Sequence, residues 1–366
     1  MSQSKIVVPK RRIIIPRMVI RERRAPPPSM RARLQPQHMR YEVGRYRERL
    51  RSGPGGLGRG RIWTPERVGE QHNLILDGAY DLPPSYGFTG LAEYAAVGTG
   101  STAPSAGDTG LEAEVARTRA VPSGEPDQTA HPSTGHYEFA RKREFTEAEV
   151  GGKNLTEWGW APAATGQLLT RELFRDGNGT PVTLTLASDQ RLRLIYTYAL
   201  DVSPTGASPA AYSLNMQNIG TLTGKVFWTG WVYAINNYYG DLVIADHLVR
   251  GEGSSTGNPY GFYFSRLTSA VTPGDNVYYP GNDFIYGTNV PVAAYSPGSR
   301  QRSLSGSLVV DTNTFNGDNY GWGWSAYEYS YGSDYRKVFV AFALDNPLSK
   351  DNLHKIVFDP WAFITW

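Results

Sequence analysis

Residues 168–202, with the sequence LLTRELFRDGNGTPVTLTLASDQRLRLIYTYALDV, contain three short runs that are typical of β-strands. The runs cover residues 168–174, 182–187 and 192–202, and each is rich in side chains that favour extended backbone. The sequence Asp-Gly-Asn-Gly at 176–179 separates the first two runs, and such a sequence favours a tight turn between antiparallel strands. This stretch therefore predicts antiparallel β-structure.

The segment before it follows the same rule. Residues 137–145, YEFARKREF, alternate apolar and charged side chains, as a half-exposed strand does. One short helix is predicted at 109–117, with Asp108 as its N-cap and with Glu112 and Glu114 in its first turns. We assign residues 63–210 to a first β domain.

The C-terminal part of the chain is rich in aromatic residues. Residues 211–366 hold 30 of the 45 aromatic residues of the chain. Short β runs are predicted there, divided by Gly, Pro, Asn and Asp, at residues 225–233, 260–264, 304–310 and 338–344. The predicted fold class is mainly β, with two antiparallel β-sandwich or jelly-roll-like domains (63–210 and 211–366) behind an extended N-terminal arm.

Two aromatic patches in this second domain, at residues 236–240 and 320–331, have two interpretations. Tyr and Trp pair a broad apolar face with a polar tip, which suits both a subunit interface and a platform that stacks on sugars. Core or interface packing is the plainer interpretation, and carbohydrate binding is the alternative. The residues concerned are Tyr238, Tyr239, Trp322, Trp324 and Tyr327.

Charge is distributed very unevenly along the chain. Residues 1–62 hold 17 Lys and Arg against three acidic residues, a net charge of +14, whereas residues 63–366 hold 20 basic and 31 acidic residues, a net charge of −11. A basic arm on an acidic body indicates a partner with acidic surfaces. We therefore assign residues 1–62 to a basic extended anchoring arm and linker.

The arm contains two copies of one short pattern, KIVVPK at 5–10 and RIIIPR at 12–17. β-branched residues favour extended backbone and proline opposes a helix, so we expect two edge strands that add to a neighbouring subunit. The Arg-rich segment up to Arg51 predicts one short helix, and residues 52–60 have the composition of a linker. The expected anchoring residues are Lys5, Ile6, Val7, Val8, Arg12, Ile13, Ile14, Ile15 and Arg17.

No sequence motif predicts an enzyme. The matches to a dinucleotide loop at 98–103, a nucleophile elbow at 253–257 and a phosphate loop at 220–225 each lack the following helix or a required residue. The six histidines show no metal-ligand spacing, and the chain has no cysteine. Asp241, Asp246 and Glu252 could supply a glycosidase carboxylate pair, but their separation cannot be read from sequence. We expect no catalytic residue, no cofactor and no metal, and no apolar run long enough to span a membrane.

Eight short blocks lie in order within residues 72–202, at residues 73–78, 94–104, 108–117, 143–146, 154–159, 168–174, 176–182 and 190–196. Together they resemble a domain common in structural proteins of tailed bacteriophages. These proteins are tail-fibre, tail-tip or neck and collar components, so the resemblance implies a virion protein, assembled in the host cytoplasm, whose partners are other virion proteins and copies of itself.

Three functions of different class follow for testing. The structural one predicts that deleting residues 1–60 leaves folded domains that no longer join the particle. The receptor-binding one predicts that residues 211–366 bind host surface glycan. The nucleic-acid one, the least favoured, predicts salt-dependent binding of the arm to DNA.

Overall fold

The computed structural model describes residues 19–23, 30–53, 56–133, 135–204, 210–216, 220–228, 245–246, 248–251, 262–267, 270, 292–310, 316–330, 333–351, 355–358 and 362–366. Strands make up 56% of it and helices 8%, and most of the strand pairs are antiparallel. The prediction of a mainly β protein with several antiparallel sheets is confirmed.

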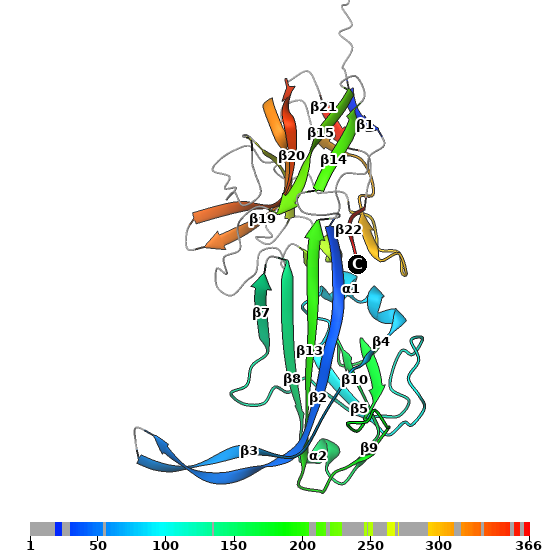
Figure 1. Cartoon of the computed structure of the whole chain (residues 1–366), viewed down its shortest axis with the longest axis vertical. Helices are drawn as coiled ribbons and strands as arrows, with labels where there is room; N and C mark the ends of the chain where they lie inside the picture. Colours follow the sequence, from blue (N-terminus) through cyan, green and yellow to red (C-terminus); the bar gives the residue numbers. More distant parts are fainter. Residues whose placement is uncertain are drawn as a thin grey trace, which may run out of the picture.

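A seven-stranded sheet forms the long axis of the lower part of the molecule (Figure 1). Its order is β17-β22-β2-β13-β8-β7, and β3 pairs with β2 beside this path. β2 is the longest strand, and it pairs with β13 from Met30↔Pro204 to Gly44↔Arg191. The strand bounds are β2 Met30–Gly53, β3 Gly56–Gln71, β7 Gln128–Ser133, β8 His136–Phe145, β13 Arg191–Pro204, β17 Gln301–Ser303 and β22 Ala362–Thr365.

A five-stranded sheet, in the order β4-β11-β10-β5-β6, lies beside the first, and β9 and β12 form a separate pair. Three short helices complete this part: η1 and α1 follow β4, and α2 follows β8 with a Thr146–Glu149 capping box at its start. The bounds are β4 Leu74–Ile75, η1 Asp77–Asp81, α1 Pro83–Tyr86, β5 Tyr94–Gly98, β6 Glu114–Thr118, α2 Glu147–Val150, β9 Asn154–Leu155, β10 Glu157–Ala161, β11 Thr170–Leu173 and β12 Leu184–Thr185.

Large aromatic side chains join these two sheets. Trp158 and Trp160, at alternate positions of β10, lie on the same face of the strand and are fully buried. The Trp160 ring stacks on Tyr196 of β13 at a centroid distance of 5.5 Å. Tyr41 of β2 meets Phe174 edge-on at 5.4 Å. Aromatic rings bury the largest areas of all side chains, so these contacts account for much of the core.

An eight-stranded sheet, in the order β16-β19-β20-β15-β14-β1-β21-β18, forms the upper part of the molecule (Figure 1). β1 comes from the N-terminal region and pairs with β14 and, in parallel, with β21 of the same chain. The bounds are β1 Val19–Arg23, β14 Ala210–Met216, β15 Gly220–Trp228, β16 Phe262–Leu267, β18 Leu308–Val310, β19 Gly317–Ser330, β20 Ser333–Lys350 and β21 Lys355–Phe358.

Segments from the C-terminal part dock on the lower sheets. β22 adds to the start of β2 in parallel, at Met30↔Ile364. Asp246, which is buried, accepts hydrogen bonds from the backbone N–H of Phe88 (2.6 Å) and from the Thr89 hydroxyl. The Arg302 guanidinium donates to the backbone carbonyls of Val249, Arg250 and Ala293. Backbone pairing and buried polar contacts therefore connect the two parts.

Several predicted elements are confirmed. Residues 137–145 and 192–202 lie in β8 and β13, and burial alternates along the first part of β8, although its buried face carries Arg141 and Arg143 as well as Tyr137 and Phe139. The turn at 176–179 forms, with the Gly179 N–H donating to the Asp176 carbonyl and Gly179 at a φ of +81°. Part of each of the other predicted runs is also strand: 168–174 in β11, 182–187 in β12, and the C-terminal runs in β15, β16, β18 and β20.

The helix predicted at 109–117 is wrong. Residues 108–113 are a loop and β6 follows at Glu114. Asp108 does not cap a helix, because its Oδ2 atom accepts from the Ser105 N–H (2.9 Å) and from Arg171 (2.5 Å). The N–H of Glu112 donates instead to buried Glu157. Carboxylates near a chain reversal give the same sequence signal whether they cap a helix or fix a loop.

The expectations for residues 30–60 are also wrong. The segment up to Arg51 is strand, not a short helix, and residues 56–60 begin β3 instead of forming a linker. Main-chain pairing with β13 and between β2 and β3 explains this result, because such pairing does not need β-branched side chains. The division of the chain at residues 62 and 210 stays a prediction, although residue 62 itself falls within β3.

Candidate functional site

The predicted site residues fall into three groups in the structure. Tyr238, Tyr239 and the nine anchoring residues of segment 5–17 lie outside the described residues. Trp324 and Tyr327 lie in β19, whose backbone pairs with β16 and β20. Trp322 forms the third group, because the structure describes its side chain as well as its backbone.

Trp322 belongs to the core. Its side chain is 1% exposed and it meets Phe358 of β21 edge-on at 5.1 Å. A ring that stacks on a sugar must present its face to solvent. Trp322 is therefore unavailable as a glycan platform, and the core interpretation is the correct one for this residue.

Asp246 likewise has a structural role. Burial raises the pKa of its carboxyl group, and hydrogen bonds to Thr89 and Phe88 oppose that rise. Both carboxylate oxygens are occupied by these contacts. The other two carboxylates of the glycosidase hypothesis, Asp241 and Glu252, lie outside the described residues.

The feature that projects from the described fold is the far half of the β2–β3 hairpin. Beyond Gly44, β2 leaves β13, and among the described strands it pairs only with β3, from Arg45↔Thr64 to Gly53↔Gly56. We call residues 45–53 and 56–64 the ribbon. Its nine residues per strand correspond to a length of about 30 Å. Figure 1 shows it extending away from the end of the sheet.

A buried arginine fixes the root of the ribbon. Arg193 of β13 is 2% exposed, and its Nη2 atom donates to the hydroxyl of Tyr46 (2.8 Å). Its guanidinium lies 4.1 Å from the ring centroid of Trp63. Its Nε atom is 2.7 Å from Glu144 and its Nη1 atom is 2.8 Å from Glu125. One cation therefore joins β2, β3, β8 and the loop before β7.

The charge state of this cluster follows from its contacts. Burial opposes the charge on Arg193, but the hydrogen bond and the charge of Glu144 outweigh it and raise the pKa of the guanidinium. Burial is also the main cause of the raised pKa of Tyr46. Trp63 adds a hydrogen bond from its Nε1 atom to Glu42 (2.8 Å). The root is thus a fully paired polar cluster, which holds the two strands in one arrangement.

A β-bulge lies where the ribbon leaves the sheet. Val43 pairs with Arg67 and Gly44 pairs with Pro65, so Glu66 is an extra residue in β3. The close approach requires glycine, because a Cβ atom on Gly44 would lie 2.4 Å from the carbonyl oxygen of Thr64. The bulge brings Glu66 to Arg45 (3.0 Å) and to Arg47.

Glu66 is held in its charged form. Hydrogen bonds from Gln190 and Arg47 are the largest causes of its lowered pKa. Gln190 and Asp189 both lie in the turn before β13, and Asp189 pairs with Arg45 at 2.7 Å. These contacts tie the base of the ribbon to the sheet from a second side.

The ribbon has two open edges. Within the described ranges, no strand pairs with β2 beyond Gly44 on the side opposite β3, and none pairs with β3 on the side opposite β2. An open edge presents unpaired N–H and C=O groups, which are a template for another strand or another chain. The ribbon carries six arginines and one glutamate, a net charge of +5.

A buried carboxylate in β10 organises the loop at residues 98–113. Glu157 is fully buried and accepts hydrogen bonds from the N–H groups of Gly100 and Ala113 and from Arg171. Arg171 also pairs with Asp108, and the hydrogen bonds from Ser105 and Arg171 lower the pKa of Asp108. Every member of this cluster has a structural partner, so it fixes the loop at 98–113 and leaves no free acid or base.

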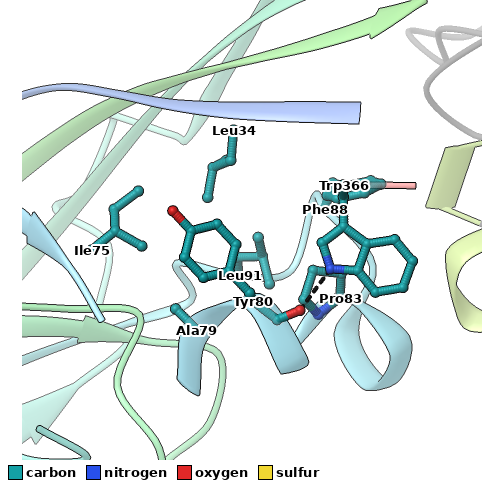
Figure 2. A pocket seen from close by; sticks show the side chains of 8 residues that line it. All are labelled: Leu34, Ile75, Ala79, Tyr80, Pro83, Phe88, Leu91 and Trp366. Atoms are coloured by element: carbon teal, nitrogen blue, oxygen red, sulfur yellow. Dashed lines mark hydrogen bonds between the residues drawn. The ribbon is translucent and has the colours of Figure 1, made fainter. Parts of the chain in front are cut away.

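The described pocket is small and apolar (Figure 2). Its volume of about 20 Å³ holds roughly one water molecule. Trp366 closes it, with its Nε1 atom donating to the carbonyl of Tyr80 (2.6 Å). The site is packing between η1, α1 and the C-terminal strand, with no room for a substrate. It is lined by Leu34, Ile75, Ala79, Tyr80, Pro83, Phe88, Leu91 and Trp366.

In the part of the chain that the structure describes, no three His, Asp or Glu side chains gather as metal ligands do. No helix among the same residues has the length and apolar character that a membrane span requires.

The chain was also compared with known proteins. No family model matches it, and neither a curated protein nor a solved structure matches it.

The sequence prediction missed the ribbon as a structural feature. A signal was present, because arginines occupy the alternate positions 45, 47, 49 and 51. Period-two spacing is typical of a strand, but charged side chains carry it here, and a search for apolar periodicity does not detect it.

Proposed function

We propose that this chain is a structural component of a tailed-phage particle, in the tail or the neck and collar, and that its basic N-terminal region anchors it to neighbouring subunits. The observation that carries the proposal is the ribbon, a basic two-stranded projection whose outer edges pair with no described strand. A projection of this kind suits contact between subunits. The sequence resemblance of residues 72–202 supplies the class of particle.

The physical basis is main-chain pairing combined with charge. An isolated two-stranded hairpin is marginally stable in water, so a partner that covers the ribbon stabilises it. Added strands contribute main-chain hydrogen bonds in register, and the positive charge speeds encounter with acidic surfaces. Residues 5–17 would add strands in the same manner.

We further propose that the facing seven- and five-stranded sheets form a β-sandwich. The stacking of Trp160 on Tyr196 and the contact of Tyr41 with Phe174 support this arrangement. The eight-stranded sheet, with its own buried aromatic residues Trp322 and Phe342, would belong to a second sandwich or jelly-roll-like unit.

Deleting residues 1–60 is not a usable test of anchoring. Met39 and Tyr41 are buried in β2, and β2 lies between β13 and β22, so that deletion removes a central strand of the sheet. Deleting residues 1–18 leaves every described strand in place. We expect this truncation to fold and to be incorporated poorly into particles.

The direct test is immunogold labelling of purified particles with an antibody against residues 211–366. Label at a fixed position on the tail or neck is expected. Absence of the chain from purified particles, with abundant chain in the cell extract, would contradict the structural function.

A further inference from the structure

The arginines of the ribbon are arranged in a row on one face. Arg45, Arg47 and Arg49 occupy alternate positions of β2, so their side chains project from the same face about 7 Å apart. The register places Thr64, Ile62 and Gly60 opposite them. Glycine has no side chain, so Arg49 has no cross-strand side chain opposite it. In the backbone register, Arg51 follows opposite Gly58.

Neutralisation of this row decreases along the ribbon. Arg45 pairs with Glu66 (3.0 Å) and Asp189 (2.7 Å), and Arg47 pairs with Glu66. Arg49 is exposed, and no described acidic side chain pairs with it. The chain therefore neutralises the arginines at the root and leaves the next one available.

The same chain is poorly placed to supply the missing carboxylates. The last pair between β2 and β13 is Gly44↔Arg191, and beyond it the ribbon extends away from the end of the sheet (Figure 1). No carboxylate of the described residues pairs with Arg49, so we expect its partner on another molecule. Arginine suits this contact because its planar fork binds a carboxylate through two parallel hydrogen bonds.

Charge complementarity identifies the partner. Residues 63–366 hold 31 acidic and 20 basic residues, so a second copy of this chain presents an acidic body. Nucleic acid fits less well, because that acidic body would be repelled by phosphates. We infer that the ribbon of one copy binds carboxylates on the body of a second copy, with Arg49 as a principal contact.

This inference deepens the proposed structural function and rests on it for its biological setting. Ribbon-to-body contact is heterologous, because different surfaces of the two copies meet. Such an interface closes into a ring when its rotation allows and otherwise forms a filament. One ribbon and one acidic binding surface on each chain are therefore enough to build a multimer.

The test is sedimentation velocity of the full-length chain over a concentration series at low and high salt. We expect association that weakens with salt, because the contact is between charges near the surface. Arg49→Glu should weaken it about tenfold or more. Arg119→Glu is the matched control, since it makes the same charge change at an exposed arginine outside the ribbon.

A second variant separates the loss of the contact from a loss of folding. Replacing residues 48–61 by Asn-Gly retains the Arg47↔Ile62 pair and the Tyr46–Trp63 contact at the root, and supplies a two-residue hairpin turn. This shortened chain should keep its circular dichroism spectrum and its thermal midpoint, and should be monomeric.

Three results would overturn the inference. These are a wild-type chain that stays monomeric at every concentration, equal association of the wild type and the shortened chain, or duplex DNA binding that depends on Arg49 while association does not. The proposed function fails separately, since it is tested by labelling of particles. A chain that is monomeric but present on particles would refute the contact between the ribbon and a second copy, and would leave the proposed function standing.

Discussion

The two halves of β2 differ in what holds them. Residues 30–43 lie between β13 and β22 or β3, with Met39, Tyr41 and Val43 buried in the core. Residues 45–53 pair with β3 and with no other strand that the structure describes, and their alternate positions carry arginine. One continuous strand therefore serves two purposes: the first half is held by burial, and the second is available for contact. Arg193 and Gly44 mark the boundary.

The largest expected effect tests the buried arginine at this boundary. Arg193→Ala removes one of the two arginines that pair with buried Glu144, together with the contacts to Tyr46 and Trp63, and should lower the free energy of unfolding by about 3 kcal/mol. Arg49→Ala, the control in the ribbon, should change it by less than about 0.5 kcal/mol. Urea unfolding followed by circular dichroism measures both. Equal losses would mean that root and ribbon are held in the same way.

The next effect concerns the bulge. Gly44→Ala forces a Cβ atom against the backbone of Thr64 and should cost about 1–3 kcal/mol, because backbone yields less readily than a flexible side chain. Gly110→Ala is the matched control, since no atom lies within 4 Å of the Cβ position there. Thermal unfolding of both variants gives the comparison. A neutral Gly44→Ala would show that the bulge is not needed.

The far end of the sheet should respond to rising pH. A hydrogen bond to Asp201 raises the pKa of His136, and Asp201 also accepts from Gln35 of β2. A raised pKa stabilises the fold below the ordinary value of 6.5, and this contribution is lost as pH rises through the folded pKa. The stability difference between wild type and His136→Gln should be larger at mildly acidic pH than at alkaline pH. A difference independent of pH would contradict the pairing.

The smallest expected effect lies at the root of the ribbon. Its dependence on pH is opposite to that of His136, because stability is lost as pH falls. The lowered pKa of Glu66 stabilises the fold above its ordinary value of 4.5, and this contribution is lost as pH falls through the folded pKa. Exposure keeps the effect small. The stability difference between wild type and Glu66→Gln should therefore disappear at acid pH. Arg47→Gln, which removes one partner, should reduce that pH dependence, and an unchanged profile would rule out the contact.

The sheet strands could be predicted because their signal is local. In β8, the alternating pattern predicts the strand, and the structure buries Tyr137, Phe139 and Phe145 on one face, together with Arg141 and Arg143, whose burial the pattern does not predict. The turn at 176–179 is likewise specified by its own glycines and by Asp176. The pairing of β2 with β13 across about 150 residues has no local signal, because register between distant strands depends on the folded core.

The structure of the ribbon, in contrast, could not be predicted from its local sequence. The Arg-rich segment up to Arg51 predicts a short helix and the glycines give residues 52–60 the composition of a linker, yet the root contact of Tyr46 with Trp63 lies within two strands that pair in register. That contact requires Arg193, which lies some 130 residues further along the chain. Composition describes the ribbon as if it were alone, whereas its structure depends on the sheet it leaves.

The central claim is that the ribbon contacts a second copy, and zero-length cross-linking tests it most directly. The variant Arg49→Lys places an amine at the contact, and a carbodiimide joins it to a carboxylate within contact distance. An equal mixture of ¹⁵N-labelled and unlabelled chains separates contacts between copies from contacts within one chain. We predict mixed-isotope peptides that join Lys at position 49 to acidic residues of 63–366. Cross-links found only within single chains, or none at position 49, would contradict the claim.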